Sequence, residues 1–158
     1  MKAVIASRLV DAVGVIENPV VLIDEGRIVE AGPRDKVKVP ANAEVIDASG
    51  NILMPGIVDC HVHFTGSKVS TLDLSREPYE VRVVRAAVDQ TKKLTDAGIL
   101  GVMDTGGMIG LGVRNAINAG VVPGPRVKAA GRYLSTTSGH GDTHYLPVEW
   151  VEEGRSYG

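Results

Sequence analysis

Two histidines separated by one residue, His61 and His63, are the side chains of this sequence best suited to bind a metal ion. They close an apolar run that follows Pro55-Gly56, which places them at the C-terminal end of a predicted strand over 57–63. Residues two apart on a strand point the same way, with Cα atoms roughly 6.6 Å apart. Both imidazoles could therefore converge on one ion at the zinc–nitrogen distance of about 2.0–2.1 Å. The alternative is an ordinary polar pair at a strand end, and the strand context favours the metal site.

The residues around this pair divide by strand parity. Asp59 has the parity of the two histidines, so we expect it to orient one of them without binding the metal itself. Cys60 and Val62 have the opposite parity and are expected to face packing helices, which predicts a buried, slowly reacting thiol. Asp104 ends a later apolar run, where capping of the next turn is the simpler interpretation.

A polar loop, Ser135–His144, is the second candidate for chemistry. Two glycines flank His140 and permit a close approach of the backbone to a ligand, so His140 is a candidate substrate-binding residue. Asp142 and His144 are weaker candidates. A solvated loop without function is the alternative, because this Gly/Ser/Thr composition is typical of loops.

The elements that must position these residues fall into two groups. Before residue 50 we expect only short strands, with a hairpin turn at Glu25-Gly26; the predicted strands are 3–10, 20–24, 27–31 and 44–47. After residue 56 the order is strand, helix, strand, helix, strand, which predicts parallel β/α units; their ranges are 57–63, 80–97, 99–103, 113–119 and 127–130. The long helix is predicted from an apolar stripe of Val81, Val84, Val88, Leu94 and Ala97.

Composition excludes several classes of function. The chain has 158 residues, 44% of them hydrophobic and 23% charged, with a formal net charge of −2. This balance gives no electrostatic case for nucleic acid or an anionic membrane as a partner. The single cysteine excludes an internal disulfide framework, and neither a secretory signal nor a membrane-spanning run is visible, so we expect a cytoplasmic protein.

The combination of motifs resembles one protein family, the amidohydrolase superfamily of metal-dependent hydrolases. The segment 55–63, Pro-Gly-Ile-Val-Asp-Cys-His-Val-His, resembles its first barrel strand, and the segments 24–32 and 45–50 resemble its N-terminal β-sandwich portion. The segments 96–107 and 124–142 resemble its second and third strands with their loops. Imidazolonepropionase-like and Xaa-Pro dipeptidase-like members are the most similar.

The resemblance implies an α/β fold in which a small β-sandwich portion (1–52) precedes the first three β/α units (53–158) of a (β/α)₈ TIM barrel. Three strands cannot close a barrel that needs roughly 250 residues, so we expect the barrel to be incomplete in this chain. The family implies one or two divalent metal ions, usually zinc, with His61 and His63 as ligands. Its remaining ligands and its aspartate general base come from later strands, so we expect no complete catalytic set here.

Three functional hypotheses follow. The first is an enzyme that hydrolyses carbon–nitrogen bonds of an amide, cyclic amide or dipeptide-like small molecule with metal-activated water, as part of a complete barrel. The second is a truncated, non-catalytic structural or binding piece that needs a complementary C-terminal polypeptide. A homo-oligomer stays open as a further partner. The third is a stand-alone metal-binding module. Two histidines leave zinc short of its usual three protein ligands, so catalysis by this chain alone is not expected.

Overall fold

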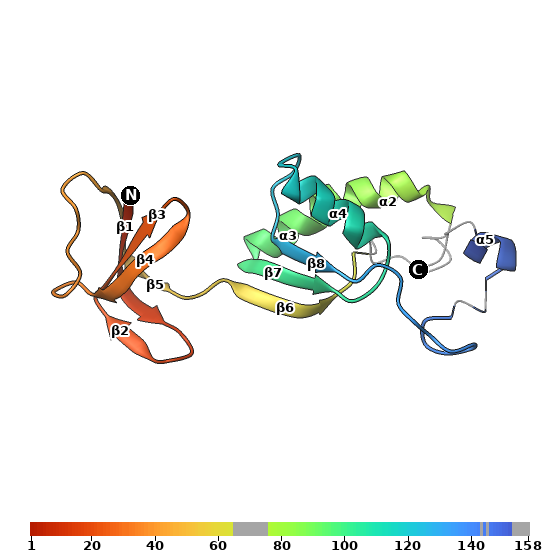
Figure 1. Ribbon diagram of the computed structural model, residues 1–158, viewed down its shortest axis with the longest axis horizontal. Helices are drawn as coiled ribbons and strands as arrows, with labels where there is room; N and C mark the ends of the chain where they lie inside the picture. The colour runs from red at the N-terminus through yellow and green to blue at the C-terminus, as the bar shows by residue number, and fades with distance from the viewer. Residues whose placement is uncertain (65–75, 143, 145, 153–158) are drawn as a thin grey trace. The chain divides into compact units, whose positions relative to one another are not determined.

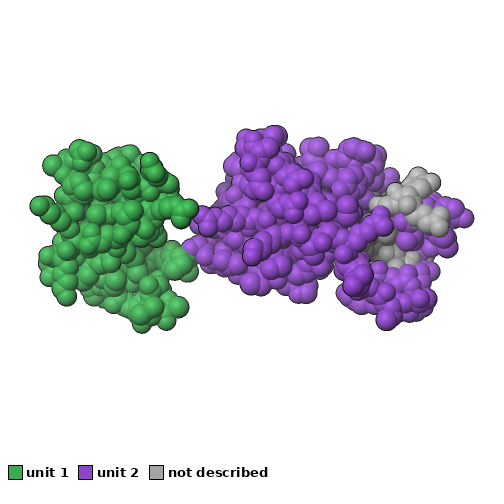
Figure 2. Space-filling view, viewed as in Figure 1, with its two compact units in different colours: residues 1–55 green, residues 56–158 purple. Residues whose placement is uncertain are grey.

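The computed structural model of the chain describes residues 1–64, 76–142, 144 and 146–152. The chain divides into two compact units, Met1–Pro55 and Gly56–Gly158 (Figure 2). Each unit has a hydrophobic cluster of its own.

The first unit is a five-stranded sheet (Figure 1). Its strands are β1 (Lys2–Val10), β2 (Val15–Glu17), β3 (Pro19–Asp24), β4 (Arg27–Pro33) and β5 (Glu44–Leu53). Strand β1 pairs antiparallel with β2 and β3 and parallel with β5. Glu25 and Gly26 both have positive φ, 46° and 75°, as the two central residues of a type I′ turn require, so the predicted hairpin is confirmed. The short strand β2 was not predicted.

The second unit contains a three-stranded parallel sheet in the order β6-β7-β8. Its strands are β6 (Ile57–Val62), β7 (Ile99–Asp104) and β8 (Arg126–Ala129). Helical segments α2 (Tyr79–Arg85), η1 (Ala86–Gln90, a π-helix) and α3 (Thr91–Asp96) connect β6 to β7, and α4 (Ile109–Asn118) connects β7 to β8. A short helix, α5 (Val148–Glu152), follows. The predicted parallel β/α order is confirmed, and the chain is a mixed α/β protein.

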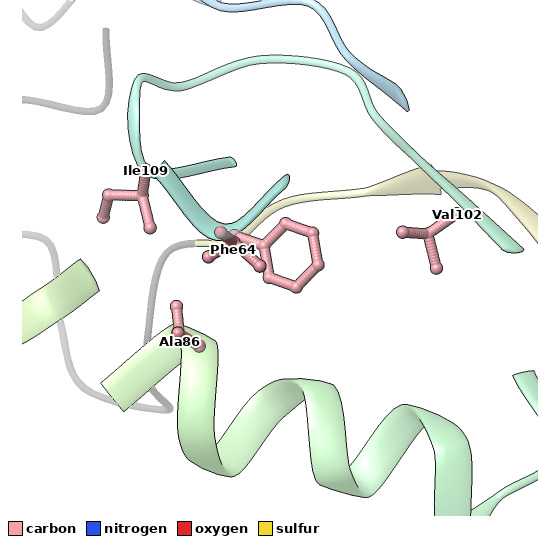
Figure 3. Close-up of a cluster of buried hydrophobic side chains, with 6 residues drawn as sticks. Phe64, Ala86, Val102 and Ile109 are labelled. Carbon is pink, nitrogen blue, oxygen red and sulfur yellow. The ribbon is translucent and has the colours of Figure 1, made fainter. Parts of the chain in front are cut away.

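The helices α2, α3 and α4 lie on the same face of this sheet (Figure 1). The core between them is small: Phe64, Ala86, Val102 and Ile109 form part of one buried cluster (Figure 3). Phe64 directly follows His63, so burial of its ring anchors the end of the histidine motif to the helices.

The predicted helix over 80–97 is confirmed as a helical segment. Of its predicted apolar stripe, Leu94 packs against the core, but the three valines do not face it. Val81, Val84 and Val88 are 44%, 62% and 59% exposed, whereas Ala86 and Ala87 are buried. The prediction weighted branched apolar side chains. The contact face is instead set by two alanines, whose small side chains let the helix approach the sheet closely.

Helix α4 begins at Ile109, four residues before the predicted start at 113. Gly110 and Gly112 hid its first turn, because glycine is a poor helix former. Gly110 has a steric role here: a Cβ built on it would lie 1.8 Å from Oδ2 of Asp104. None of the helices in the described residues is long and apolar enough to cross a bilayer.

Candidate metal centre

Strand β6 contains an irregularity just before the second histidine. Asp59 pairs with Val102 and Val62 pairs with Asp104, so β6 advances three residues where β7 advances two. Such a bulge interrupts the strict alternation of side chains. Val62 packs against the helix-facing core, but Cys60 is exposed. The prediction of a buried Cys60 is therefore wrong, because it extended the alternation of the strand through the bulge.

The structure brings the rings of His61 and His63 together at the C-terminal end of β6. Their centroids are 5.3 Å apart and their planes cross at 70°. Two imidazoles bound to one zinc ion at about 2.0–2.1 Å, in tetrahedral geometry, have centroids about 5 Å apart. Edge-to-face ring packing occupies the same range, so the spacing fits a metal site but does not select one.

Hydrogen bonding fixes the orientation of His63. Its Nδ1 lies 3.1 Å from the carbonyl oxygen of Gly106. A carbonyl only accepts, so Nδ1 carries the proton, and in the neutral ring Nε2 keeps its lone pair. The hydroxyl of Thr105 is 3.4 Å from Nε2, a long and weak contact. Histidines that bind a metal through one ring nitrogen commonly donate a hydrogen bond from the N–H of the other to a backbone carbonyl, as His63 does here.

Asp59 contacts the main chain of His61. Its Oδ1 accepts the backbone N–H of His61 at 3.1 Å. This bond fixes the backbone that carries His61. Orientation of a ring by Asp59 remains a prediction.

Asp104, the last residue of β7, is fully buried next to this pair. Its Oδ1 accepts the backbone N–H of Gly106 at 3.0 Å. Burial raises the pKa of the Asp104 carboxyl, while the backbone N–H groups of Gly106 and Phe64 and the charge of His63 oppose that shift. From the sequence, capping of the next turn was the favoured role for Asp104, over a functional one. Its position, a carboxylate at the end of an apolar strand, was the sequence feature that could have indicated a role beyond capping.

The loop that contains His140 packs near the histidine pair, because the Tyr133 ring lies between it and Gly106. Cβ atoms built on Gly106 and Gly141 would lie 2.1 Å and 2.2 Å from atoms of the Tyr133 ring. The ring therefore packs against the backbone of both glycines, next to the residue whose carbonyl binds His63. His140 itself is exposed. The role of His140 as a substrate contact remains a prediction. Its neighbour Gly141 contacts one edge of the Tyr133 ring, and Gly106 contacts the other.

The set of metal ligands is not complete within the described part of the chain. Among residues 1–64, 76–142, 144 and 146–152, no group of three or more His, Cys, Asp or Glu side chains is gathered around one point. The His61–His63 pair fits two ligand positions of an ion, by its ring spacing and by the tautomer of His63. Further ligands would have to come from outside these residues.

Comparison with known proteins identifies relatives of this chain. Over 162 aligned residues the chain is 28% identical to imidazolonepropionase of Bradyrhizobium sp., an alignment that covers 86% of the chain and 39% of the relative. Over 103 residues it is 36% identical to ochratoxinase of Aspergillus niger, covering 61% of the chain and 20% of the relative. A solved Xaa-Pro dipeptidase with bound methionine superposes with a TM-score of 0.79 and 27% identity, over 94% of the chain and 37% of that structure.

The chain belongs to the amidohydrolase superfamily. No family model matches it. The chain spans between about a fifth and two fifths of the lengths of these relatives. In this relative of the amidohydrolases, His61 lies in the first strand of the parallel sheet and His63 directly after it, with Asp104 at the end of the second strand.

Proposed function

We propose that the protein carrying this chain is a metal-dependent hydrolase of carbon–nitrogen bonds and that His61 and His63 bind its divalent ion, with zinc as the expected metal. The orientation of His63 is the observation that carries the proposal: Nδ1 donates to Gly106, so Nε2 is the ring atom available to a metal beside His61, with the Thr105 hydroxyl 3.4 Å from it. The superfamily supports it, since its members act on carbon–nitrogen bonds and generally use divalent metals.

A divalent ion at this pair would lower the pKa of a bound water and polarise the scissile carbonyl. The residues of the chain have distinct tasks in this scheme. The Gly106 carbonyl holds the His63 ring by accepting its Nδ1 proton. The Asp59 carboxylate holds the His61 backbone by accepting the N–H of His61. His140 is the proposed substrate contact, in a loop attached through Tyr133 to Gly106.

The substrate class we propose is a small amide, cyclic amide or dipeptide-like molecule. The relatives named imidazolonepropionase and Xaa-Pro dipeptidase support this choice. We further propose that residues 1–52 form part of a β-sandwich and that 53–158 form the first three units of a TIM barrel, whose other strands supply the remaining ligands and the general base. The alternative is a non-catalytic piece, favoured by the incomplete ligand set in the described residues.

The test is an assay of the intact protein on dipeptides, N-acyl amino acids and cyclic amides. We expect hydrolysis that a chelator abolishes and that added zinc restores. His63→Ala should lose turnover, because it removes a ligand. Ser7→Ala is a matched surface control in the first unit, since it removes one exposed hydrogen bond to Asn51 far along the sequence from the site. Turnover that survives both the chelator and His63→Ala would contradict the proposal.

A further inference from the structure

Asp104 is held in an unusual environment for a carboxylate. Its exposed fraction is 0%, and within the described residues its Oδ2 has no hydrogen-bond partner. Burying a charged group without full hydrogen bonding costs folding free energy. Such a cost indicates a role that a simple exposed cap would not need.

Asp47 shows what a cap alone requires. Its Oδ1 accepts the backbone N–H of Ser49, two residues on, at 2.9 Å, just as Asp104 accepts that of Gly106 at 3.0 Å. Asp47 does so while exposed, and its hydrogen bonds to Ser49 lower its pKa. The local bond is therefore available without burial.

Asp104 differs from Asp47 because Gly106, the residue that it binds, also binds the His63 ring. Gly106 donates its N–H to Asp104 and accepts the Nδ1 proton of His63 with its carbonyl. Thr105 adds a bond between the two strand ends, from its N–H to the Val62 carbonyl at 3.1 Å. The Asp104 carboxylate thus holds Gly106, the residue whose carbonyl holds the His63 ring.

Two glycines make this arrangement sterically possible. A Cβ on Gly110 would lie 1.8 Å from Oδ2 of Asp104, so the first turn of α4 can close over the carboxylate only without a side chain there. A Cβ on Gly106 would lie 2.1 Å from the Tyr133 ring. The first turn of α4 therefore leaves the carboxylate little room to move, and the Tyr133 ring restrains Gly106, to which the carboxylate is bonded.

We propose that Asp104 is a positioning residue for His63: through Gly106 its carboxylate fixes the His63 ring in the Nδ1–H tautomer and presents Nε2 to the metal. The proposal rests on the proposed function, in which His63 binds the ion. The tautomer is a property of the metal-free protein, so the two can fail separately.

The experiment records the ¹⁵N spectrum of the histidine rings in the intact, chelator-treated protein, with His63→Gln used for assignment. The native protein should show His63 as the Nδ1–H tautomer. Asp104→Ala should shift His63 toward Nε2–H and weaken zinc binding by about 10–100-fold, the usual effect of losing an outer partner. Asp104→Asn keeps an acceptor oxygen of the same shape and should retain the native tautomer.

The matched control is Asp47→Ala, which removes the same kind of local bond in the first unit and should change neither readout. If Asp104→Ala does not fold, Asp104→Glu takes its place, because one added methylene displaces the carboxylate while keeping the charge. An unchanged tautomer and unchanged zinc affinity in the substituted protein would overturn the positioning role. A native protein that binds no zinc would instead contradict the proposed function and leave the tautomer comparison intact.

Discussion

At the level of single residues, two hydrogen bonds in series connect Asp104 through Gly106 to His63 and orient its ring. The histidine pair could be predicted from the sequence, since its spacing and its place after Pro55-Gly56 carry the signal. The series could not be predicted, because it depends on which backbone groups meet where two strands end. The burial of Asp104 likewise depends on Gly110, because any side chain at that position would collide with the carboxylate. The sequence does not show which residue lies against Gly110.

Substitution of Gly110 tests this packing. Gly110→Ala places a methyl group on the Asp104 carboxylate, and overpacking of this kind costs about 1–3 kcal/mol of stability. Gly112→Ala in the same helix is the control. Within the described residues its Cβ meets the Val83 side chain, Cγ1 at 3.2 Å and Cγ2 at 3.9 Å, and the gain in helix propensity of up to about 1 kcal/mol opposes that contact. Urea unfolding measures both, and equal stability of the two variants would contradict the packing described here.

The buried carboxyl also predicts a dependence of stability on pH. Burial raises the pKa of Asp104, so the folded state binds this proton more tightly than the unfolded state does. The resulting stabilisation is fully present below the unfolded pKa of about 4 and is lost as pH rises through the folded pKa. Native protein should therefore gain stability relative to Asp104→Asn as pH falls from neutral toward about 4.

The measurement is urea unfolding of the metal-free native and Asp104→Asn proteins across that pH range. Taking the difference between the two proteins removes the contributions of their other titrating groups. A difference that stays constant with pH, or that moves in favour of the variant on acidification, would count against a buried Asp104.

At the element scale, the sequence predicted the strands and their parallel order better than it predicted which faces are buried. The strand order after residue 56 follows from alternating strand and helix patterns. The bulge in β6 and the π-helix η1 each change the register by local insertion, which a fixed period of two or 3.6 residues cannot represent. The bulge is the reason why the prediction for Cys60 was wrong. The prediction for the valine stripe fails already before η1 begins, since Val81 and Val84 are exposed, because it gave weight to branched apolar side chains.

A pair of substitutions in the helical segment 79–96 tests its buried face. Ala86 is fully buried among Phe64 and Val102, so Ala86→Leu should destabilise the protein by about 1–3 kcal/mol. Val88 is 59% exposed, so Val88→Leu should change stability by less than about 0.5 kcal/mol. Thermal or urea unfolding compares them. A larger loss from Val88→Leu than from Ala86→Leu would show that the predicted valine stripe faces the core after all.

At the scale of the whole molecule, the parallel sheet of the second unit has exposed apolar residues on its strands. Val58 is 64% exposed, Leu100 52% and Met103 40%. Exposed strand surface of this kind promotes association. We therefore expect residues 1–158, expressed alone, to self-associate, and the double variant Val58→Lys with Met103→Lys to do so less. Sedimentation velocity over a range of concentrations is the measurement, and a native chain that stays monomeric throughout would contradict this expectation.

The metal content of the purified intact protein shows whether His61 and His63 bind a metal ion. Elemental analysis should find a divalent metal, with zinc expected, in the native protein and its loss from the double variant His61→Ala with His63→Ala. The variant His144→Ala is the control, because this exposed histidine lies in the polar loop, with Nδ1 3.0 Å from the Asp142 carbonyl oxygen, and should retain the metal. An unchanged metal content in a folded double variant would contradict the assignment of the site.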